Sequence, residues 1–257
     1  MNRFQRDARV VRHEVVAEGI HVLAVECADI AQRTLPGQFV NVRLQDGSYG
    51  PLLRRPFSIS RVDGNVLELL YNIVGAGTRL MASRRPGDVL DLLGPLGKQF
   101  GTETPFETAI LVGGGLGVAP FPILTEDLRR RGISVQTYLG ARTERHLVRR
   151  HLENVHVATD DGTAGDRGTV VDLVRRHLHD RMPVGPKIFG CGPTPMLKAL
   201  ATMSLQLGVE CELSLEGDMA CGIGICQGCP VERTSGPKKY ALVCTDGPTF
   251  HAQDVRL

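Results

Sequence analysis

Four cysteines near the end of the chain constrain its fold and chemistry more than any other feature. Cys221, Cys226 and Cys229 have the spacing C-x4-C-x2-C, and Cys244 follows after fourteen further residues. This is the plant-type ferredoxin spacing, in which four thiolates hold a two-iron two-sulfur (2Fe-2S) cluster. Three glycines allow the loop to curve tightly: Gly222, Gly224 and Gly228. We predict that the four cysteines are metal ligands in a small C-terminal iron-sulfur domain, residues 211–257.

A zinc site is the alternative for these cysteines. Structural zinc sites prefer two C-x2-C pairs, whereas the only such pair here is Cys226 and Cys229. Cys27 and Cys211 lack any such setting and are expected to be buried apolar residues. Because the sequence is rich in Cys and Gly and has no periodicity beyond Cys211, we expect order there to depend on something other than a hydrophobic core.

The first hundred residues predict an antiparallel β-barrel. Short Val- and Leu-rich segments alternate with turn signals, as in closed all-β domains. Strands are expected at residues 8–16, 20–26, 38–43, 57–61, 66–73 and 89–93, with a short helix from Thr78. Turns are expected at Pro36-Gly37, Asp46-Gly47, Asp63-Gly64-Asn65 and Pro86-Gly87. The predicted barrel domain is residues 1–101.

After residue 101 short buried strands alternate with helical segments, which is typical of a parallel sheet covered on both faces. Strands are expected at residues 110–112, 133–139, 155–159 and 187–189, and helices at 121–131, 169–179 and 195–207. For the last helix, Thr194 is the predicted N-cap and Gly208 the predicted stop. The chain is thus expected to be multidomain, with an α/β nucleotide domain at residues 102–210.

Glycine loops at one edge of this sheet indicate a nucleotide site. The strand at 110–112 runs into a loop, and so does the strand at 187–189; a third loop, Asp160-Asp161-Gly162, follows another strand. Such loops let a chain approach a pyrophosphate closely at a helix N-terminus. The first spacing is not G-x-G-x-x-G, so a plain turn explains it equally well by itself. The predicted nucleotide ligands are Gly113, Gly114, Gly115, Gly117, Gly190, Cys191, Gly192 and Pro193.

Three barrel segments contain groups that suit a flavin. An arginine can fork onto phosphate and a serine hydroxyl can bond the flavin ring. Gly77-Thr78 opens a helix whose N-terminus can take a pyrophosphate. An exposed arginine pair and an ordinary turn remain an equal alternative from chemistry alone. The candidate residues are Arg55, Pro56, Phe57, Ser58, Tyr71, Asn72, Ile73, Gly77 and Thr78.

Taken in this order, these segments resemble the ferredoxin-NADP reductase superfamily. With the cysteine loop, the chain resembles more narrowly the electron-transfer subunits of FAD- and iron-sulfur-containing dihydroorotate dehydrogenases. The segments that carry the resemblance are 53–59 (LRRPFSI), 93–97 (LGPLG), 191–197 (CGPTPML), 219–224 (MACGIG) and 242–248 (LVCTDGP). It runs from about residue 10 to residue 255.

The resemblance implies cofactors, a reaction and a partner. FAD would lie on the barrel segments, NAD on the two glycine loops, and the 2Fe-2S cluster on the four cysteines. A separate FMN-bearing catalytic subunit would oxidise dihydroorotate and send electrons through the cluster and FAD to NAD, in a heterotetramer with two copies of each subunit. The chain would be an NAD-linked oxidoreductase subunit. No catalytic triad is required, and none is found.

Other readings stay open from the residues. The same module could serve a hydrogenase, a sulfide dehydrogenase or a ferredoxin-linked transhydrogenase, and a zinc-stapled nucleotide-binding protein is a reading from another class. NAD and NADP are not distinguished, since Arg142 and Arg145 could meet a ribose phosphate or only solvent. A net charge of +2 implies no nucleic acid or membrane partner. Without an apolar segment in residues 1–9 we expect no signal peptide and a cytoplasmic protein.

Overall fold

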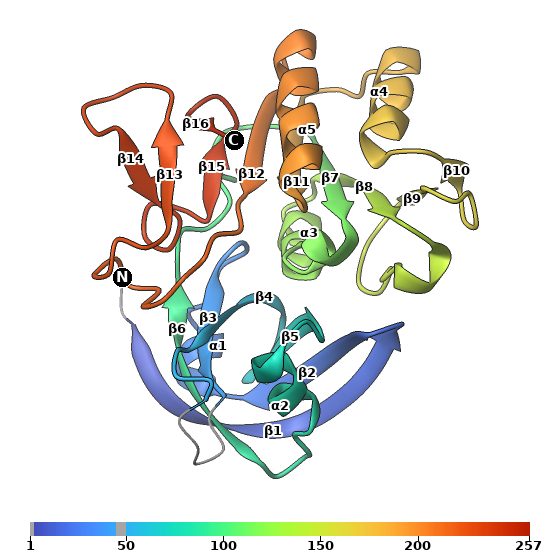
Figure 1. Ribbon diagram of the computed structural model, residues 1–257. Coiled ribbons are helices and arrows are strands. Elements are labelled where there is room, and N and C mark those ends of the chain that lie inside the picture. Colours follow the sequence, from blue (N-terminus) through green and yellow to red (C-terminus); the bar gives the residue numbers. More distant parts are fainter. Residues whose placement is uncertain (1–2, 45–49) are drawn as a thin grey trace.

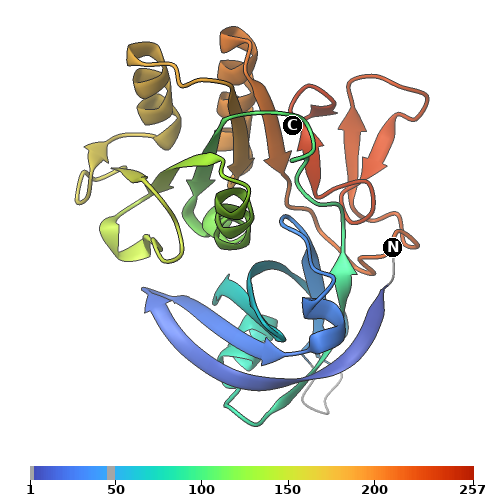
Figure 2. The ribbon, with the colours of Figure 1, turned by 180° about the vertical axis from the view of Figure 1, so that it is seen from behind.

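The structure is a computed structural model that describes residues 3–44 and 50–257. It contains a β-barrel, a sheet flanked by helices and a small C-terminal unit (Figure 1). In Figure 1 the barrel lies below the sheet, and the C-terminal unit lies beside the sheet, near the N-terminus. Figure 2 shows the same three parts from behind. The predicted multidomain architecture is confirmed.

Six antiparallel strands close the barrel in the order β1-β2-β5-β4-β3-β6. All six predicted strands are present, three of them longer than predicted, and the helix begins two residues before Thr78. The predicted Asp46-Gly47 turn lies outside the described residues. The elements are β1 (Phe4–Ala17), β2 (Ile20–Glu26), α1 (Ala28–Ala31), β3 (Phe39–Arg43), β4 (Arg55–Asp63), β5 (Val66–Asn72), α2 (Ala76–Ala82) and β6 (Val89–Leu96).

Strand β3 shows how alternation divides the barrel wall between two cores. Val40 and Val42 pack in the interior of the barrel. Phe39 packs instead against residues of the C-terminal unit, because successive side chains of a strand point to opposite faces. The outer face of β3 is therefore an interface between two parts of the protein.

The α/β domain has a seven-stranded sheet in the order β10-β9-β8-β7-β11-β12-β15, parallel except for β15. Alternate β7 side chains pack on opposite sides, with Ala109 and Leu111 toward α3 and Ile110 and Val112 toward α4 and α5. The elements are β7 (Thr108–Gly114), η1 (Gly115–Val118), α3 (Phe121–Arg130), β8 (Ser134–Ala141), η2 (Glu144–His146), β9 (Val155–Thr159), β10 (Asp166–Arg167), α4 (Val170–Asp180), β11 (Pro186–Cys191), α5 (Thr194–Leu207) and β12 (Glu210–Ser214).

Strand order reverses between β7 and β11, which are neighbours in the sheet although β8, β9 and β10 intervene in the chain. In open α/β sheets the carboxyl ends of strands on either side of such a reversal form a ligand crevice. The two glycine loops predicted for the nucleotide follow β7 and β11. Topology therefore brings them to the same edge.

Helix α5 corrects one prediction and confirms another. Its N-cap is Pro193, not Thr194, because the Leu197 N–H donates to the Pro193 carbonyl (3.1 Å) and closes the first turn one residue earlier. Gly208 ends the helix with φ +65°, a left-handed conformation that suits glycine. None of the helices in the described ranges is long and apolar enough to cross a membrane.

The C-terminal unit has a three-stranded sheet and shares a core with the α/β domain. Strand β15 pairs with β12, so the predicted boundary at 210/211 falls inside a strand of the larger sheet. Val243 and Phe250 are buried in the same cluster as Leu213, so the expectation of order without a hydrophobic core was wrong. The strands are too short to produce a visible period: β13 (Pro230–Arg233), β14 (Tyr240–Leu242), β15 (Thr249–His251) and β16 (Val255–Arg256).

Candidate functional site

The four predicted ligands lie together as two pairs of thiols. The Cys226 N–H donates to Cys221 Sγ (3.4 Å), and the Cys244 N–H donates to Cys229 Sγ (3.4 Å). The side chains within each pair are also in hydrogen-bonding contact. Cys229 and Cys244 are buried, whereas Cys226 is exposed. One side of the loop thus faces the protein core and the other faces solvent.

Backbone amides favour the thiolate form of one ligand. Burial opposes ionisation of Cys221, but N–H groups of Cys226 and Ile223 that point at its sulfur lower its pKa to about 6. Burial, together with the neighbouring Cys229 thiol, raises the pKa of Cys244 to about 12. Because several N–H groups of the loop point at sulfur, the loop stabilises negative charge on the sulfur atoms.

The pairing fits a two-iron cluster better than a single zinc ion. Only Glu210, Glu212 and His251, among the residues described, bring three ligand atoms within 4.8 Å of one another, so no three cysteine sulfurs do. A tetrahedral zinc ion with bonds of about 2.3 Å needs all four sulfurs roughly 3.8 Å apart. Two separated pairs match two iron atoms, each held by two thiolates. The thiol donors and glycine curvature therefore fit the predicted 2Fe-2S group.

A cavity of about 820 Å³ lies between the barrel, the α/β sheet and the cysteine loop. Ala220 and Gly228, each next to a ligand cysteine, form part of its wall. The volume is in the range of cofactor sites. Most of the predicted flavin residues line it, together with one nucleotide-loop residue: Arg55, Pro56, Phe57, Ser58, Tyr71, Asn72, Gly77, Thr78 and Cys191.

The structure separates the roles of two adjacent arginines. The Arg54 guanidinium is tied to Asp91 by an ion pair (2.6 Å) and a bond to its carbonyl (3.0 Å). Arg55 lines the cavity, and its guanidinium donates to the backbone carbonyls of Leu53 and Arg54. A cation beside the N-terminus of α2 can meet a pyrophosphate, so the cavity fits FAD at this end.

Tyr71 is held rigidly at the cavity wall. Its side chain is buried, its hydroxyl bonds His13 Nε2 (3.0 Å), and its ring stacks on His21 (5.4 Å). Burial raises the pKa of Tyr71, so the hydroxyl stays protonated at neutral pH. Ile73, two residues later, is 39% exposed and is not part of the cavity wall.

The two glycine loops at the sheet edge pack directly on each other. A Cβ on Gly117 would lie 2.1 Å from the Cys191 carbonyl oxygen, and one on Gly114 would lie 2.6 Å from Met196 Sδ. Glycine is required here by close approach. These loops adjoin the cavity through Leu116, Ala119 and Cys191, while the other predicted glycines and Pro193 lie outside its wall.

Sequence reasoning missed a polar group opposite the barrel. Ser214 and Glu216 line the cavity beside Cys191. Burial, followed by the charge of Glu216, raises the pKa of Cys191 to about 12, against the effect of a hydrogen bond with Ser214. Burial also raises the pKa of Glu216. Ser214 lies at the carboxyl end of β12, where ligands of such sheets bind. Because β12 was not predicted, this position was not recognised.

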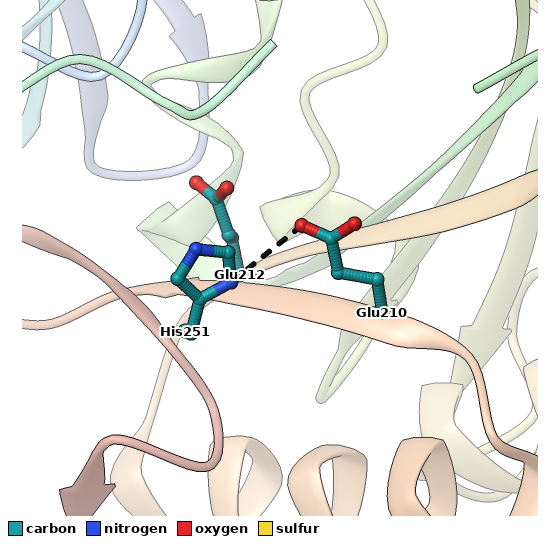
Figure 3. Close-up of side chains that lie close together, drawn as sticks. All are labelled: Glu210, Glu212 and His251. Atoms are coloured by element: carbon teal, nitrogen blue, oxygen red, sulfur yellow. Dashed lines mark ion pairs between the residues drawn. The ribbon is translucent and has the colours of Figure 1, made fainter. Parts of the chain in front are cut away.

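Glu210, Glu212 and His251 form a second polar cluster, shown in Figure 3. His251 Nδ1 lies 3.6 Å from Glu210. The buried Lys187 ammonium lies 2.6 Å from Glu210 and 2.9 Å from Glu212. Because a lysine already supplies the positive charge, we interpret this cluster as an ion network that supports the fold.

Comparisons with known proteins agree with this geometry. Residues 216–256 match the family model for the iron-sulfur cluster binding domain of dihydroorotate dehydrogenase B. A dihydroorotate dehydrogenase B (NAD(+)) electron transfer subunit from Geobacillus sp. (strain WCH70) is 39% identical, over 98% of this chain and 99% of the relative. The corresponding Fusobacterium nucleatum subunit is 36% identical, over 98% of both chains.

Solved structures show the same fold. A chain from the structure of an NADH-dependent reduced ferredoxin-NADP oxidoreductase has a TM-score of 0.84 and 27% identity, over 97% of this chain and 89% of that one. The ferredoxin reductase of carbazole 1,9a-dioxygenase has a TM-score of 0.68 and 24% identity, over 81% of this chain and 67% of that one. On its sequence and its fold, this chain belongs to the family of dihydroorotate dehydrogenase B electron transfer subunits.

Proposed function

We propose that this chain carries electrons from the catalytic subunit of a dihydroorotate dehydrogenase B to NAD through a 2Fe-2S cluster and FAD. The single observation that carries the proposal is the shared cavity. Its wall contains barrel residues such as Arg55 and Ser58, the sheet-edge residue Cys191, and Ala220 and Gly228 from either side of the cysteine loop. Residues suited to FAD, to the nicotinamide nucleotide and to the cluster thus line one cavity.

The bound groups supply the chemistry: a nicotinamide exchanges two electrons as a hydride, the cluster passes one at a time, and FAD accepts both modes. The residues of the chain position and insulate these groups. Arg55 and the start of α2 would bind the FAD pyrophosphate, and Ser58 and Tyr71 would lie against the flavin. Cys221, Cys226, Cys229 and Cys244 would bind iron.

The nicotinamide nucleotide would enter from the sheet edge formed by β7 and β11. The loops at Gly113, Gly114, Gly115 and Gly117 and at Gly190, Gly192 and Pro193 would hold it. Cys191, Ser214 and Glu216 would flank the reacting end. Because its raised pKa keeps the Cys191 thiol neutral, it would contribute packing and a weak hydrogen bond instead of a charge.

We further propose the division of labour within the complex. Residues 1–101 would hold FAD, 102–210 the nucleotide and 211–257 the cluster. The partner would be an FMN-bearing catalytic subunit in a cytoplasmic heterotetramer of two plus two. The exposed part of the cysteine loop, around Ile225 and Cys226, is where such a partner would dock, because one-electron transfer requires close approach.

The first experiment is an analysis of the purified protein for iron, sulfide, zinc and flavin. We expect two iron, two sulfide and one FAD per chain, with zinc absent. Co-expression with the neighbouring catalytic subunit should then give dihydroorotate-dependent reduction of NAD, and light scattering should give the mass of a heterotetramer. A colourless, zinc-containing preparation would refute the proposal.

A second outcome would favour a different partner. The similarity to a chain of the NADH-dependent reduced ferredoxin-NADP oxidoreductase extends over nearly the whole chain, at 27% identity. The relatives named for dihydroorotate dehydrogenase are 36 to 39% identical, which is why we prefer that reading. Full cofactor content without dihydroorotate-dependent activity, but with ferredoxin-dependent activity, would reverse this preference.

A further inference from the structure

One buried amide from the barrel reaches the cysteine loop. Asn41 lies in the middle of β3, on the outward face described above, and is fully buried. Its Nδ2 donates to the backbone carbonyl of Cys221 at 3.2 Å, across 180 residues of sequence. In Figure 1 the chain between β12 and β13 runs down to this side of the barrel. Asn41 is therefore a direct link between the flavin barrel and the first cluster ligand.

The loop backbone is shaped to receive this amide. Gly222 has φ +69°, and a Cβ at that position would lie 2.1 Å from Asn41 Nδ2. Any side chain there would both strain the backbone and displace the amide. A carbonyl can only accept, so the nitrogen of Asn41 must be the atom that faces Cys221.

Packing alone does not account for an asparagine here. The residues paired with it on the neighbouring strands, Leu93 and Pro56, are apolar, and Phe39 and Leu93 pack against the C-terminal core. Asn41 Oδ1 has no hydrogen-bond partner among the residues that the structure describes. A buried polar atom without a partner costs stability, and a leucine of similar size would avoid that cost. We therefore attribute the asparagine at this position to its hydrogen bond with the Cys221 carbonyl.

Holding that peptide orients the N–H groups that contact sulfur. The peptide group is planar, so the direction of the Cys221 carbonyl fixes the start of the turn that follows. In this turn the Ile223 and Cys226 N–H groups reach Cys221 Sγ at 3.5 and 3.4 Å. Hydrogen bonds to the sulfurs help set the reduction potential of an iron-sulfur cluster.

We propose that Asn41 is a positioning residue that sets the reduction potential of the cluster through the Cys221 peptide. The flavin domain thereby tunes the centre from which it receives electrons. This inference rests on the proposed function, because it requires the four thiols to hold a cluster. It adds a residue outside the cysteine loop to the machinery that controls electron transfer.

The test compares Asn41→Leu and Asn41→Asp with the unmodified chain. The leucine removes the donor at similar size, and the aspartate also adds a negative charge. We expect the midpoint potential of the cluster, measured by redox titration with electron paramagnetic resonance, to fall in the order unmodified, Asn41→Leu, Asn41→Asp. The flavin potential should not change. Iron per flavin is measured in every sample.

Gln38→Leu is the matched control. Gln38 is also a buried barrel amide, but it donates to the Gly97 carbonyl (2.9 Å) and not to the backbone of a predicted cluster ligand. The Gln38→Leu variant should have a lower free energy of unfolding and an unchanged cluster potential and spectrum. Where Asn41→Leu does not retain iron, Asn41→Ala, which also lacks a donor, takes its place.

The outcomes separate the two proposals. An unmodified chain without iron would refute the proposed function itself. An iron-loaded unmodified chain, with iron-loaded variants that keep its potential and spectrum, would refute only the role of Asn41 and reduce it to a structural contact.

Discussion

Single residues acquire their roles in this protein from the direction in which their side chains point. Arg54 and Arg55 are neighbours in sequence, yet one is bound to Asp91 and the other lines the cavity. Cys27, Cys191 and Cys211 are buried, as predicted for Cys27 and Cys211, while Cys226 is exposed.

Arg55→Ala should weaken FAD binding by about 10- to 100-fold, because charge-assisted hydrogen bonds contribute roughly 1.5–3 kcal/mol. Arg54→Ala should instead lower the stability of the folded protein, because the mostly buried Asp91 carboxylate loses its charged partner and keeps only neutral ones such as Gln5 among the residues described. Titration with FAD, followed by flavin fluorescence, and urea unfolding distinguish the two effects. Equal loss of FAD affinity in both variants would contradict the assignment.

The thiols should differ sharply in reactivity once iron has been removed. Backbone N–H groups lower the pKa of Cys221 to about 6, so this thiol is mostly ionised at pH 7, whereas burial raises the pKa of Cys191 to about 12 and keeps that thiol neutral. Raised pKa values also mean that reactivity at Cys191 and Cys211 should rise only in strongly alkaline solution. We expect iodoacetamide at pH 7 to label Cys221 first.

Mass spectrometry of peptides from folded protein, checked by circular dichroism, measures this labelling. Cys27→Ser serves as a control that should keep full iron content, since Cys27 packs in the barrel core and is not one of the four predicted ligands. If Cys191 were labelled as fast as Cys221, the assignment of Cys191 to a buried, neutral thiol would be contradicted.

At the scale of elements, the decisive contact is between the loops that follow β7 and β11. The loops touch because the strands are adjacent, and Gly117 has no room for a side chain beside Cys191. In contrast, Gly115 has φ +55° but open space around its Cβ position. The two glycines are required for different reasons, close approach in one and backbone conformation in the other.

Gly117→Ala should therefore separate the loops and lower affinity for the nicotinamide nucleotide by at least tenfold. Gly115→Ala should cost only about 1 kcal/mol of stability, the usual penalty for a left-handed backbone. Calorimetric titration with NADH and thermal unfolding give the two quantities. Unchanged NADH affinity in Gly117→Ala would contradict a nucleotide site at this edge.

At the scale of the whole molecule, buried charges join the parts. Lys187 on β11 contacts Glu212 on β12 and donates to the carbonyl of Gly101, in the segment that connects barrel and sheet (2.6 Å). The Gly101 N–H in turn donates to Glu212 (2.7 Å). This network fixes where the connecting segment leaves the barrel.

Lys187→Met should destabilise the protein by about 3–5 kcal/mol, because it leaves the Glu212 carboxylate buried without its partner. Urea unfolding of the complete chain measures the change in free energy. The double variant Lys187→Met with Glu212→Gln should recover part of the loss, and Lys198→Met, at an exposed site on α5, should have little effect. A small change in the free energy of unfolding of Lys187→Met would show that this ion network is not essential to the fold.

The surface around the cluster gives the prediction for assembly. Ile225 is 77% exposed between two of the predicted ligand cysteines, and Leu205 on α5 is similarly exposed at 62%. Ile225→Glu should weaken binding to the catalytic subunit at least tenfold without loss of iron or FAD, since it places a charge in a docking surface. Leu205→Glu is the control. Co-purification with the catalytic subunit and light scattering measure assembly. If the partner docks elsewhere, Ile225→Glu and Leu205→Glu should assemble with it equally well.

Much of the architecture could be predicted because its signals are local. All six barrel strands, the four longer sheet strands and the three main helices follow from periodicity and turn residues. Strand β10 and strands β12 to β16 were missed, because most of them span only two to four residues and show no period, and the cysteine spacing dominates the composition of the C-terminal ones. The same brevity led to the wrong expectation that this region lacks a hydrophobic core.

The cysteine loop, the glycine loops and the order of the three parts follow from local sequence, because spacing and backbone requirements act over a few residues. Tertiary structure alone decided which distant groups meet: Asn41 with Cys221, Cys191 with Ser214 and Glu216, and Lys187 with Gly101. These contacts join residues that are mostly far apart in the chain. They depend on the strand order within the sheet and on how the barrel packs against the rest of the chain, which no local pattern encodes.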